Sequence, residues 1–373
     1  MGMADLDLSG AVLTVDLDAV VANWQTVSTH YTGGEVAGVV KADAYGTGAH
    51  KVAPALHAAG CKTFFVAHAD EGVKLRPYLG NAEIHILNGC PQGCEEAFVE
   101  HRLIPVLNGL GDIERWNAFC KTKDTRLAAD IHADSGMARL GLPKTEIDIL
   151  ADEPDRITAI DVRNLMSHLA CADEPKHAKN AEQLAAFRAA RKKLPFGKAS
   201  LCNSAGVFLG QDYHYDLARP GIALYGGTPT DNMPVHMAQV VRLQGKILQV
   251  REIDTPESVG YGASFRAAGI TRIATLAVGY ADGYLRSLSN SGHATLGGVR
   301  IPLVGRVSMD LITFDVTNVP EDQAHPGALV DLIGGDVALA DVAASGGTID
   351  YEILTSLGAR YHRIYTGKTA DRA

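Results

Sequence analysis

The sequence predicts an α/β fold in two parts: an amino-terminal (β/α)8 barrel of the TIM type, followed by a mainly-β domain. The chain has 373 residues, which is more than one ordinary domain needs. Between about residues 35 and 225, short apolar runs alternate with longer helical patterns, as in a parallel sheet covered by helices. From about residue 239, short β-branched runs separated by glycine-rich turns replace this alternation.

The barrel strands are expected at the continuous apolar runs, and the helices at the periodic segments between them. The strand-like runs are 36–40, 63–67, 82–87, 103–107, 126–131, 162–168, 200–203 and 217–224. The helical segments are 50–59, 70–78, 111–121, 144–151 and 178–193. Eight strand-like runs favour a closed barrel over an open doubly wound sheet.

Two regions flank this pattern. Residues 12–15 predict a strand, and Asp16 can cap a helix whose apolar positions start at Leu17. In the second region we expect strands at 240–252, 272–278, 295–304 and 311–316, and a short helix at 351–357. We therefore expect a barrel over 1–238 and a mainly-β domain over 239–373, with residues 1–15 free to pair with the latter.

Composition excludes several classes of function. The chain is 46% hydrophobic and carries 34 Lys and Arg against 43 Asp and Glu, a net charge of −9 without a basic run, so neither nucleic acid nor an anionic membrane is an expected partner. No apolar run approaches the ~20 residues of a membrane-spanning helix, and the acidic first residues do not form a signal peptide. Cys90 and Cys94 lack the second pair that a zinc site needs, so we expect no metal and a cytoplasmic protein with free thiols.

The most informative segment is the run from Val39 to Gly48. Lys41 follows the first barrel strand directly, at the carboxyl end where barrel enzymes keep their active sites. Partial burial lowers the pKa of such an amine and frees it to form a Schiff base. A lysine that merely extends from the strand end into solvent fits the same pattern. The glycines behind Lys41 lack the spacing of a dinucleotide fingerprint.

This run resembles the cofactor-lysine motif of alanine racemases, which hold pyridoxal 5'-phosphate on that lysine. Further segments are similar to that family in the same order along nearly the whole chain: 132–141, 166–174, 203–206, 219–226, 258–262, 279–284, 305–310 and 348–352. The resemblance implies interconversion of L- and D-alanine by a homodimer whose active sites combine both chains. The implied role is supply of D-alanine for peptidoglycan, or alanine catabolism.

The resemblance also implies the cofactor-binding residues, which are Lys41, Tyr45, Arg139, His168, Asn203, Ser204, Arg219, Gly221, Ile222 and Tyr351. Ser204 with the amides of Gly221 and Ile222 is expected to hold the phosphate. Arg219 is expected to face the pyridine nitrogen and leave it unprotonated, because a guanidinium keeps its proton. That arrangement weakens the ring as an electron sink and discourages transamination. Considered alone, Gly221 fits an ordinary turn after Pro220, and an isolated arginine fits a surface ion pair.

Racemisation needs two acid/base groups on opposite faces of the substrate. The resemblance implies that Lys41 serves one face and Tyr261 of the second subunit the other, with a hydrogen-bond chain through His168 to Arg219. Arg286 is expected to keep the phenol acidic, since a free phenol has a pKa of about 10.

The substrate-binding residues implied by the resemblance are Arg139, Tyr280 and Met309. The Met309 amide is expected to bind the substrate carboxylate, and Tyr280 and Tyr351 to narrow the entrance in favour of alanine. Considered alone, Tyr261 fits a strand turn and Met309 a core position.

The chain departs from the family at His132, where many members carry a carbamylated lysine that braces the arginine seven residues later, here Arg139. A histidine hydrogen bond, a bound anion or another side chain must replace that brace. Leu285 and Ser308 also depart from common family residues. Three other functions stay open: a broad-specificity racemase, a barrel-type decarboxylase and a non-enzymatic carrier of pyridoxal phosphate. Arg219 argues against the decarboxylase, and the mainly-β domain argues against the carrier.

Overall fold

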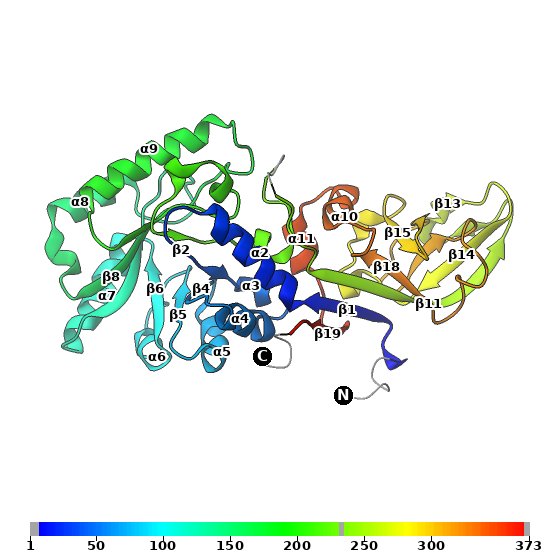
Figure 1. Cartoon of the computed structure of the whole chain (residues 1–373), viewed down its shortest axis with the longest axis horizontal. Coiled ribbons are helices and arrows are strands. Elements are labelled where there is room, and N and C mark those ends of the chain that lie inside the picture. Colours follow the sequence, from blue (N-terminus) through cyan, green and yellow to red (C-terminus); the bar gives the residue numbers. More distant parts are fainter. Residues whose placement is uncertain (1–6, 231–234, 369–373) are drawn as a thin grey trace.

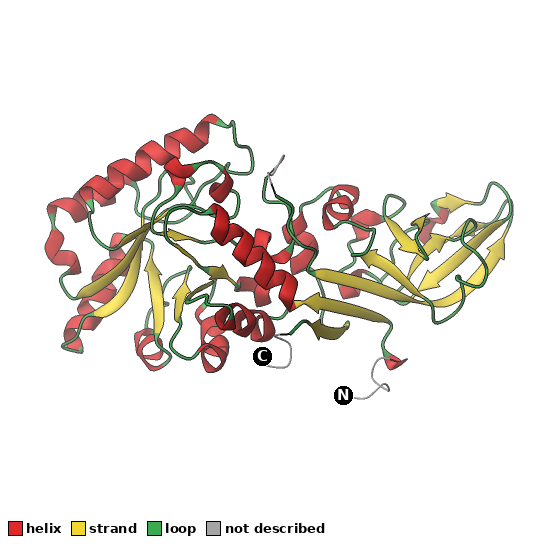
Figure 2. Ribbon diagram, viewed as in Figure 1, coloured by secondary structure: helices red, strands yellow, loops and turns green. Residues whose placement is uncertain are grey.

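The computed structural model describes residues 7–230 and 235–368. A barrel of strands and helices occupies one end of the molecule, and a strand-rich part extends from it at the other end (Figures 1 and 2). Residues 1–6, on which the signal-peptide argument partly depends, lie outside the described residues.

The barrel forms where the apolar runs predict it. Its strands are β2 (Glu35–Val36), β3 (Gly38–Val39), β4 (Thr63–Val66), β5 (Glu83–Ile86), β6 (Leu103–Leu107), β7 (Leu127–His132), β8 (Ile160–Met166), β9 (Lys198–Ser200) and β10 (Leu217–Ala218). Strands β3 to β9 form a seven-stranded parallel sheet in chain order, and β10 pairs in parallel with β2. The Asp216 amide donates to the Ala199 carbonyl at 3.0 Å, and the Arg219 amide to the Cys202 carbonyl at 2.9 Å. These bonds join the two sheets, so the predicted (β/α)8 fold class is confirmed.

Helices cover the outside of the barrel (Figure 2). They are α2 (Leu17–His30), α4 (Ala49–Ala58), α5 (Ala69–Leu79), α6 (Glu95–Glu100), α7 (Leu110–Thr122), α8 (Lys144–Asp152) and α9 (Ala178–Lys193). As expected, Asp16 caps α2, because its Oδ1 accepts a hydrogen bond from the Ala19 amide at 3.0 Å. A further short segment, α3 (Lys41–Tyr45), lies at the carboxyl end of β3.

The carboxyl-terminal part is built around a mixed sheet in the order β16-β15-β18-β11-β1-β19, from which β14 and β17 branch. Its strands are β1 (Ala11–Asp16), β11 (Val241–Ile253), β14 (Thr271–Leu276), β15 (His293–Leu296), β16 (Val299–Pro302), β17 (Ile312–Asp315), β18 (Leu329–Ile333) and β19 (His362–Thr366). Two short helices pack there, α10 (Leu339–Gly346) and α11 (Asp350–Thr355), and β12 (Ser258–Val259) and β13 (Phe265–Arg266) form a small separate hairpin. The amino-terminal strand β1 is antiparallel to β11 and parallel to β19, so the two ends of the chain share this sheet.

Several sequence-based element assignments were wrong in detail, among them the run 36–40, which is divided between β2 and β3 in separate sheets. Residues 295–304 form a hairpin of β15 and β16, because Gly297 and Gly298 adopt positive φ angles of 59° and 80° and turn the chain back. The run 217–224 contains only the short β10, and a 3-10 turn over Ile222–Tyr225 follows. The run 200–203 lies mostly beyond β9, which ends at Ser200. In the run 217–224, the backbone conformation after Pro220 ends the strand, and apolar composition does not reveal that conformation.

Two features are absent from the described residues. None of their helices combines the length and the apolar character that crossing a bilayer requires. Within the same ranges, no group of three or more His, Cys, Asp and Glu side chains is placed to share a metal ion.

Candidate active site

A cavity of about 540 Å³ opens at the carboxyl end of the barrel strands. Its wall contains every residue that the sequence analysis assigned to the cofactor: Lys41, Tyr45, Arg139, His168, Asn203, Ser204, Arg219, Gly221, Ile222 and Tyr351. These residues are spread over more than 300 positions of the chain, and the folding of a single chain brings them together.

Lys41 lies at the end of β3 and faces this cavity. Burial lowers the pKa of its amine, and the positive charge of Arg139 lowers it further, whereas Glu71 acts in the opposite direction. The Lys41 amine is therefore unprotonated more often than a lysine amine in water, and in that form it can act as a nucleophile or base.

The four residues after Lys41 form a left-handed turn without glycine. Residues Ala42 to Tyr45 have φ angles between 52° and 55°, a conformation that costs roughly 1–2 kcal/mol per residue. Glu71 stabilises it: one carboxylate oxygen accepts from the Ala42 amide at 2.6 Å, and the other from the Ala67 and His68 amides at 2.8 and 3.0 Å. Local strain held by such bonds is common at functional sites.

Sequence reasoning missed both this turn and Glu71. The available signal is the position of Glu71 in the first turn of α5, where an acid often caps a helix. That position gives no indication that the same carboxylate also reaches Ala42.

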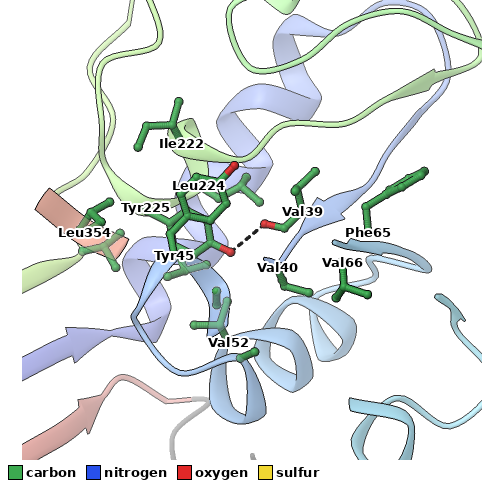
Figure 3. Packing of buried hydrophobic residues seen from close by; sticks show 14 of the residues in the cluster. Val39, Val40, Tyr45, Val52, Phe65, Val66, Ile222, Leu224, Tyr225 and Leu354 are labelled. Carbon is green, nitrogen blue, oxygen red and sulfur yellow. Dashed lines mark hydrogen bonds between the residues drawn. The ribbon is translucent and has the colours of Figure 1, made fainter. Parts of the chain in front are cut away.

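The opposite side of the cavity offers a hydroxyl and backbone amides. The Ser204 Oγ accepts hydrogen bonds from the Gly221 amide at 2.8 Å and the Ala223 amide at 3.3 Å. A Cβ at position 221 would lie 2.1 Å from the Tyr45 hydroxyl oxygen, so only glycine fits. The Tyr45 ring stacks on the Tyr225 ring at 4.6 Å, and the Tyr225 hydroxyl donates to the Val39 carbonyl at 2.8 Å (Figure 3). Tyr45 is thereby held against Gly221.

Arg219 is buried in the barrel interior, with 4% of its surface exposed. Its guanidinium donates to the Ser167 carbonyl and to the Ser200 hydroxyl. Among the described residues, no carboxylate lies within ion-pair distance of it. Burial lowers the pKa of Arg219 to about 10, which still leaves it charged at neutral pH.

His168 is kept neutral in the same wall. Burial lowers its pKa well below the ordinary value, and the positive charges of Arg219, Arg139 and Lys41 lower it further. At neutral pH its imidazole can therefore accept one hydrogen bond and donate another, as a relay requires.

The cavity is strongly electropositive. Lys41, Arg139 and Arg219 line it, and within the described ranges no Asp or Glu side chain does. An anionic ligand is therefore favoured, and a ligand with a cationic side chain would find no counter-ion in this wall.

Three predicted residues lie outside the cavity wall, on the strand-rich part. Tyr261 is 72% exposed, Met309 54% and Tyr280 43%. The Tyr280 amide donates to the Ser308 carbonyl and the Ala281 amide to the Met309 carbonyl, both at 3.0 Å, so Tyr280 and Met309 are neighbours.

Tyr261 projects from a turn between two glycines, Gly260 and Gly262, which both have φ of 72°. A Cβ at Gly262 would lie 3.0 Å from Nη1 of Arg306, so the Arg306 side chain lies beside this turn. Sequence reasoning did not identify Arg306. Arg286 begins the short 3-10 helix Arg286–Leu288 on the same part of the molecule, and among the described residues no hydrogen bond joins it to Tyr261.

Together, the fold and the cavity define a barrel protein with a lysine amine and two arginines facing an anion-binding cavity, joined to a strand-rich part. Comparison with known families agrees with this description. Residues 15–229 match the model of the alanine racemase N-terminal domain, and residues 240–365 match that of the alanine racemase C-terminal domain. The chain belongs to the alanine racemase family.

Individual relatives match over nearly the full length. The chain is 51% identical to an alanine racemase of Rhodospirillum rubrum, over 98% of both chains. It is 48% identical to a catabolic alanine racemase of Agrobacterium fabrum, over 95% of this chain and 91% of the relative. Among solved structures, the alanine racemase of Bartonella henselae with covalently bound pyridoxal phosphate superimposes with a TM-score of 0.92 at 43% identity, covering 96% of this chain and 100% of that one.

Proposed function

We propose that this protein is a pyridoxal-phosphate-dependent enzyme that interconverts L-alanine and D-alanine. The observation that carries the proposal is the cavity: a lysine amine of lowered pKa faces an arginine that lacks a carboxylate partner, with a glycine-lined hydroxyl and amide cradle beside them. When bound there, pyridoxal phosphate withdraws electrons from the substrate Cα and makes its proton acidic.

The residues present fit this cofactor. Lys41 supplies the amine that would hold it covalently, and the hydroxyl of Ser204, whose oxygen accepts from the Gly221 amide, would donate to a phosphate. Tyr45, His168, Asn203, Ile222 and Tyr351 complete the wall around that space. Glycine at position 221 lets the chain approach an anion closely, and the Tyr45 hydroxyl occupies the space that a larger side chain would need.

Lys41 and Tyr261 are the two proton carriers of the proposed mechanism. Lys41 Nζ removes or returns the Cα proton on one face, and the phenol of Tyr261 of the partner subunit acts on the other. Tyr261 is exposed on its own chain, which leaves it free to enter a neighbouring cavity. The protein in this proposal is a homodimer that builds each site from two chains.

Arg219 and His168 hold protons without releasing them. With a pKa of about 10, Arg219 would donate a hydrogen bond to the ring nitrogen of the cofactor and keep its own proton at neutral pH. His168 stays neutral and would link Tyr261 to Arg219 through hydrogen bonds. A ring nitrogen left unprotonated would favour delivery of a proton to Cα over transamination.

Arg139 and the Met309 amide of the partner subunit bind the substrate carboxylate, and Tyr280 and Tyr351 narrow the entrance. Among the described residues, the cavity wall has no carboxylate to pair with a lysine or arginine substrate. We therefore propose selectivity for alanine over basic amino acids, in contrast to a broad-specificity racemase. The cellular role we propose is cytoplasmic D-alanine supply for peptidoglycan or alanine catabolism; a D-alanine requirement in a deletion strain tests the biosynthetic role.

Chiral analysis of product tests the reaction. L-Alanine, L-serine and L-lysine are incubated separately with protein loaded with pyridoxal phosphate. We expect D-alanine to approach an equal mixture with L-alanine, with little D-serine or D-lysine. Racemisation of all three would contradict the selectivity argument, and the absence of any D-product would contradict the proposed function.

A further inference from the structure

His132 lies at the end of β7 in the wall of the active-site cavity, and no step described so far uses it. Its ring is half-buried. The segment after it turns back, because the Leu142 amide donates to the His132 carbonyl at 2.7 Å and the Asp134 amide to the Leu142 carbonyl at 2.9 Å. This turn carries Arg139, so His132 forms the base of the loop that bears the arginine.

Asn108 fixes which ring nitrogen of His132 carries the proton. The Asn108 Nδ2 donates to the Leu87 carbonyl at 3.1 Å and to the Val106 carbonyl at 3.0 Å. These two bonds assign the amide nitrogen, so Oδ1 is the atom that lies 2.8 Å from His132 Nδ1. An amide oxygen only accepts, and therefore His132 Nδ1 must be the donor.

The charges around His132 keep its ring neutral. Burial and the positive charges of Arg219 and Arg139 together lower its pKa to about 4, with Asp134 acting in the opposite direction. His168 is the other titratable ring nearby, and it is neutral as well. A neutral imidazole with a proton on Nδ1 has a lone pair on Nε2.

The arginine loop packs against the His132 ring. A Cβ at Gly141, two residues after Arg139, would lie 3.1 Å from His132 Cδ2, the ring carbon bonded to Nε2. Arg139 is exposed at the cavity, and no ion pair of its guanidinium occurs among the described residues. Its fork of N–H donors exceeds what one substrate carboxylate can occupy.

We propose that His132, held by Asn108 with its proton on Nδ1, is a positioning residue for Arg139: its Nε2 accepts a hydrogen bond from the guanidinium and orients it toward the substrate carboxylate. Because this acceptor is neutral, it orients Arg139 without offsetting the positive charge that binds the substrate carboxylate. The part of this proposal that concerns the substrate rests on the proposed function, whereas the protonation state of His132 does not.

Nitrogen NMR of 15N-histidine-labelled protein tests the protonation state without using activity. His132→Gln assigns the His132 signals among the 14 histidines. At pH 7 we expect a protonated-type shift for Nδ1 and an unprotonated-type shift for Nε2. A proton on Nε2, or a charged ring, would overturn the proposal.

The variant Asn108→Asp tests the positioning role. A carboxylate at position 108 should raise the pKa of His132, because it favours the charged ring. The protonated ring would repel Arg139, so the KM for L-alanine relative to wild type should rise about tenfold or more as pH falls from 9 to 6, with a smaller change in kcat. Above the new pKa the ring is neutral again, and KM should approach the wild-type value.

Asn88→Asp is the control, because Asn88 lines the cavity but its side-chain amide contacts His68 rather than His132. Its added charge should weaken binding of the substrate carboxylate and so raise the KM for L-alanine, but this increase should not grow as the pH falls. The variant should leave the His132 nitrogen shifts unchanged. The same pH-dependent KM in both variants would show a general charge effect and overturn the positioning role. Failure of racemisation in wild type, with the expected NMR shifts, would instead contradict only the proposed function.

Discussion

The cavity of the barrel and the exposed face of the strand-rich part differ in how far the folding of one chain fixes their functional side chains. Arg219 in the cavity is 4% exposed and hydrogen-bonded through both terminal guanidinium nitrogens, whereas Tyr261 on the other part is 72% exposed on a turn between two glycines. Folding of one chain therefore completes the cofactor cradle. We expect the second proton carrier to arrive only when another chain approaches.

Variants in the two regions should complement each other if this comparison holds. Lys41→Ala and Tyr261→Phe should each lose roughly 10²–10⁴-fold or more in kcat, because each removes a proton carrier. A mixed dimer, co-expressed with two tags and purified through both, has one intact site and one site with both changes. We expect it to recover about half of the wild-type activity.

Lys74→Ala is the control for this experiment, since Lys74 is an exposed lysine that forms a surface ion pair with Asp70. It should retain wild-type activity. A mixed dimer as inactive as its parents would mean that one chain supplies both bases, and the contrast between the two regions would have no catalytic meaning.

The sequence predicts those cavity residues whose position follows from the barrel alone. Lys41 comes directly after an apolar run, and the carboxyl ends of parallel strands meet at one face of a barrel. Arg219 lies inside the predicted run 217–224 and is selected through the family resemblance; in the structure it follows β10, which ends at Ala218. Without the family resemblance, the sequence offers no comparable reason to select Tyr261, because an exposed tyrosine in a turn has no pattern of its own.

Contacts between distant segments could not be predicted. Glu71 reaches back to Ala42, and His85 Nδ1 lies 2.6 Å from Asp130 Oδ2 in the closed interior of the barrel. Burial opposes the charge on His85, but Asp130 and Glu83 more than offset it and raise the pKa of His85 to about 9. Hydrophobic periodicity records which positions are buried, and it does not record which polar groups meet there.

A substitution at Gly221 should disturb the cofactor site in the barrel without altering the exposed face that carries Tyr261. In Gly221→Ala the new methyl group would lie 2.1 Å from the Tyr45 hydroxyl oxygen and displace a stacked, buried ring. Overpacking of this kind costs about 1–3 kcal/mol, so we expect the affinity for pyridoxal phosphate to fall by about 5- to 100-fold. Titration of the apoprotein with the cofactor measures it.

Gly111→Ala provides the matched control, because no atom would lie within 4 Å of its Cβ in α7. It should bind the cofactor as wild type does, and the better helix propensity of alanine should not lower stability. Equal cofactor affinity in the two variants would mean that the approach of Tyr45 to Gly221 does not shape the phosphate site.

The smallest expected effect concerns the turn that follows Lys41. Glu71→Gln removes the negative charge and places an amide NH2 opposite backbone N–H groups that now donate to the carboxylate. We expect a loss of about 1–3 kcal/mol in the free energy of unfolding. Because Glu71 raises the pKa of Lys41, its neutralisation should lower that pKa further, and the acidic limb of the pH–rate profile should move to lower pH.

Glu96→Gln separates this effect from the loss of any surface carboxylate, since Glu96 only forms an exposed ion pair with Lys123. That control should change stability by less than about 1 kcal/mol and leave the pH–rate profile in place. If Glu71→Gln behaved in the same way, the left-handed turn would hold its shape without the carboxylate. The conformation of this turn beside the cavity would then depend on the burial of Tyr45 and on the hydrogen bond from the Ala49 amide to Asp43 at 2.7 Å, rather than on Glu71.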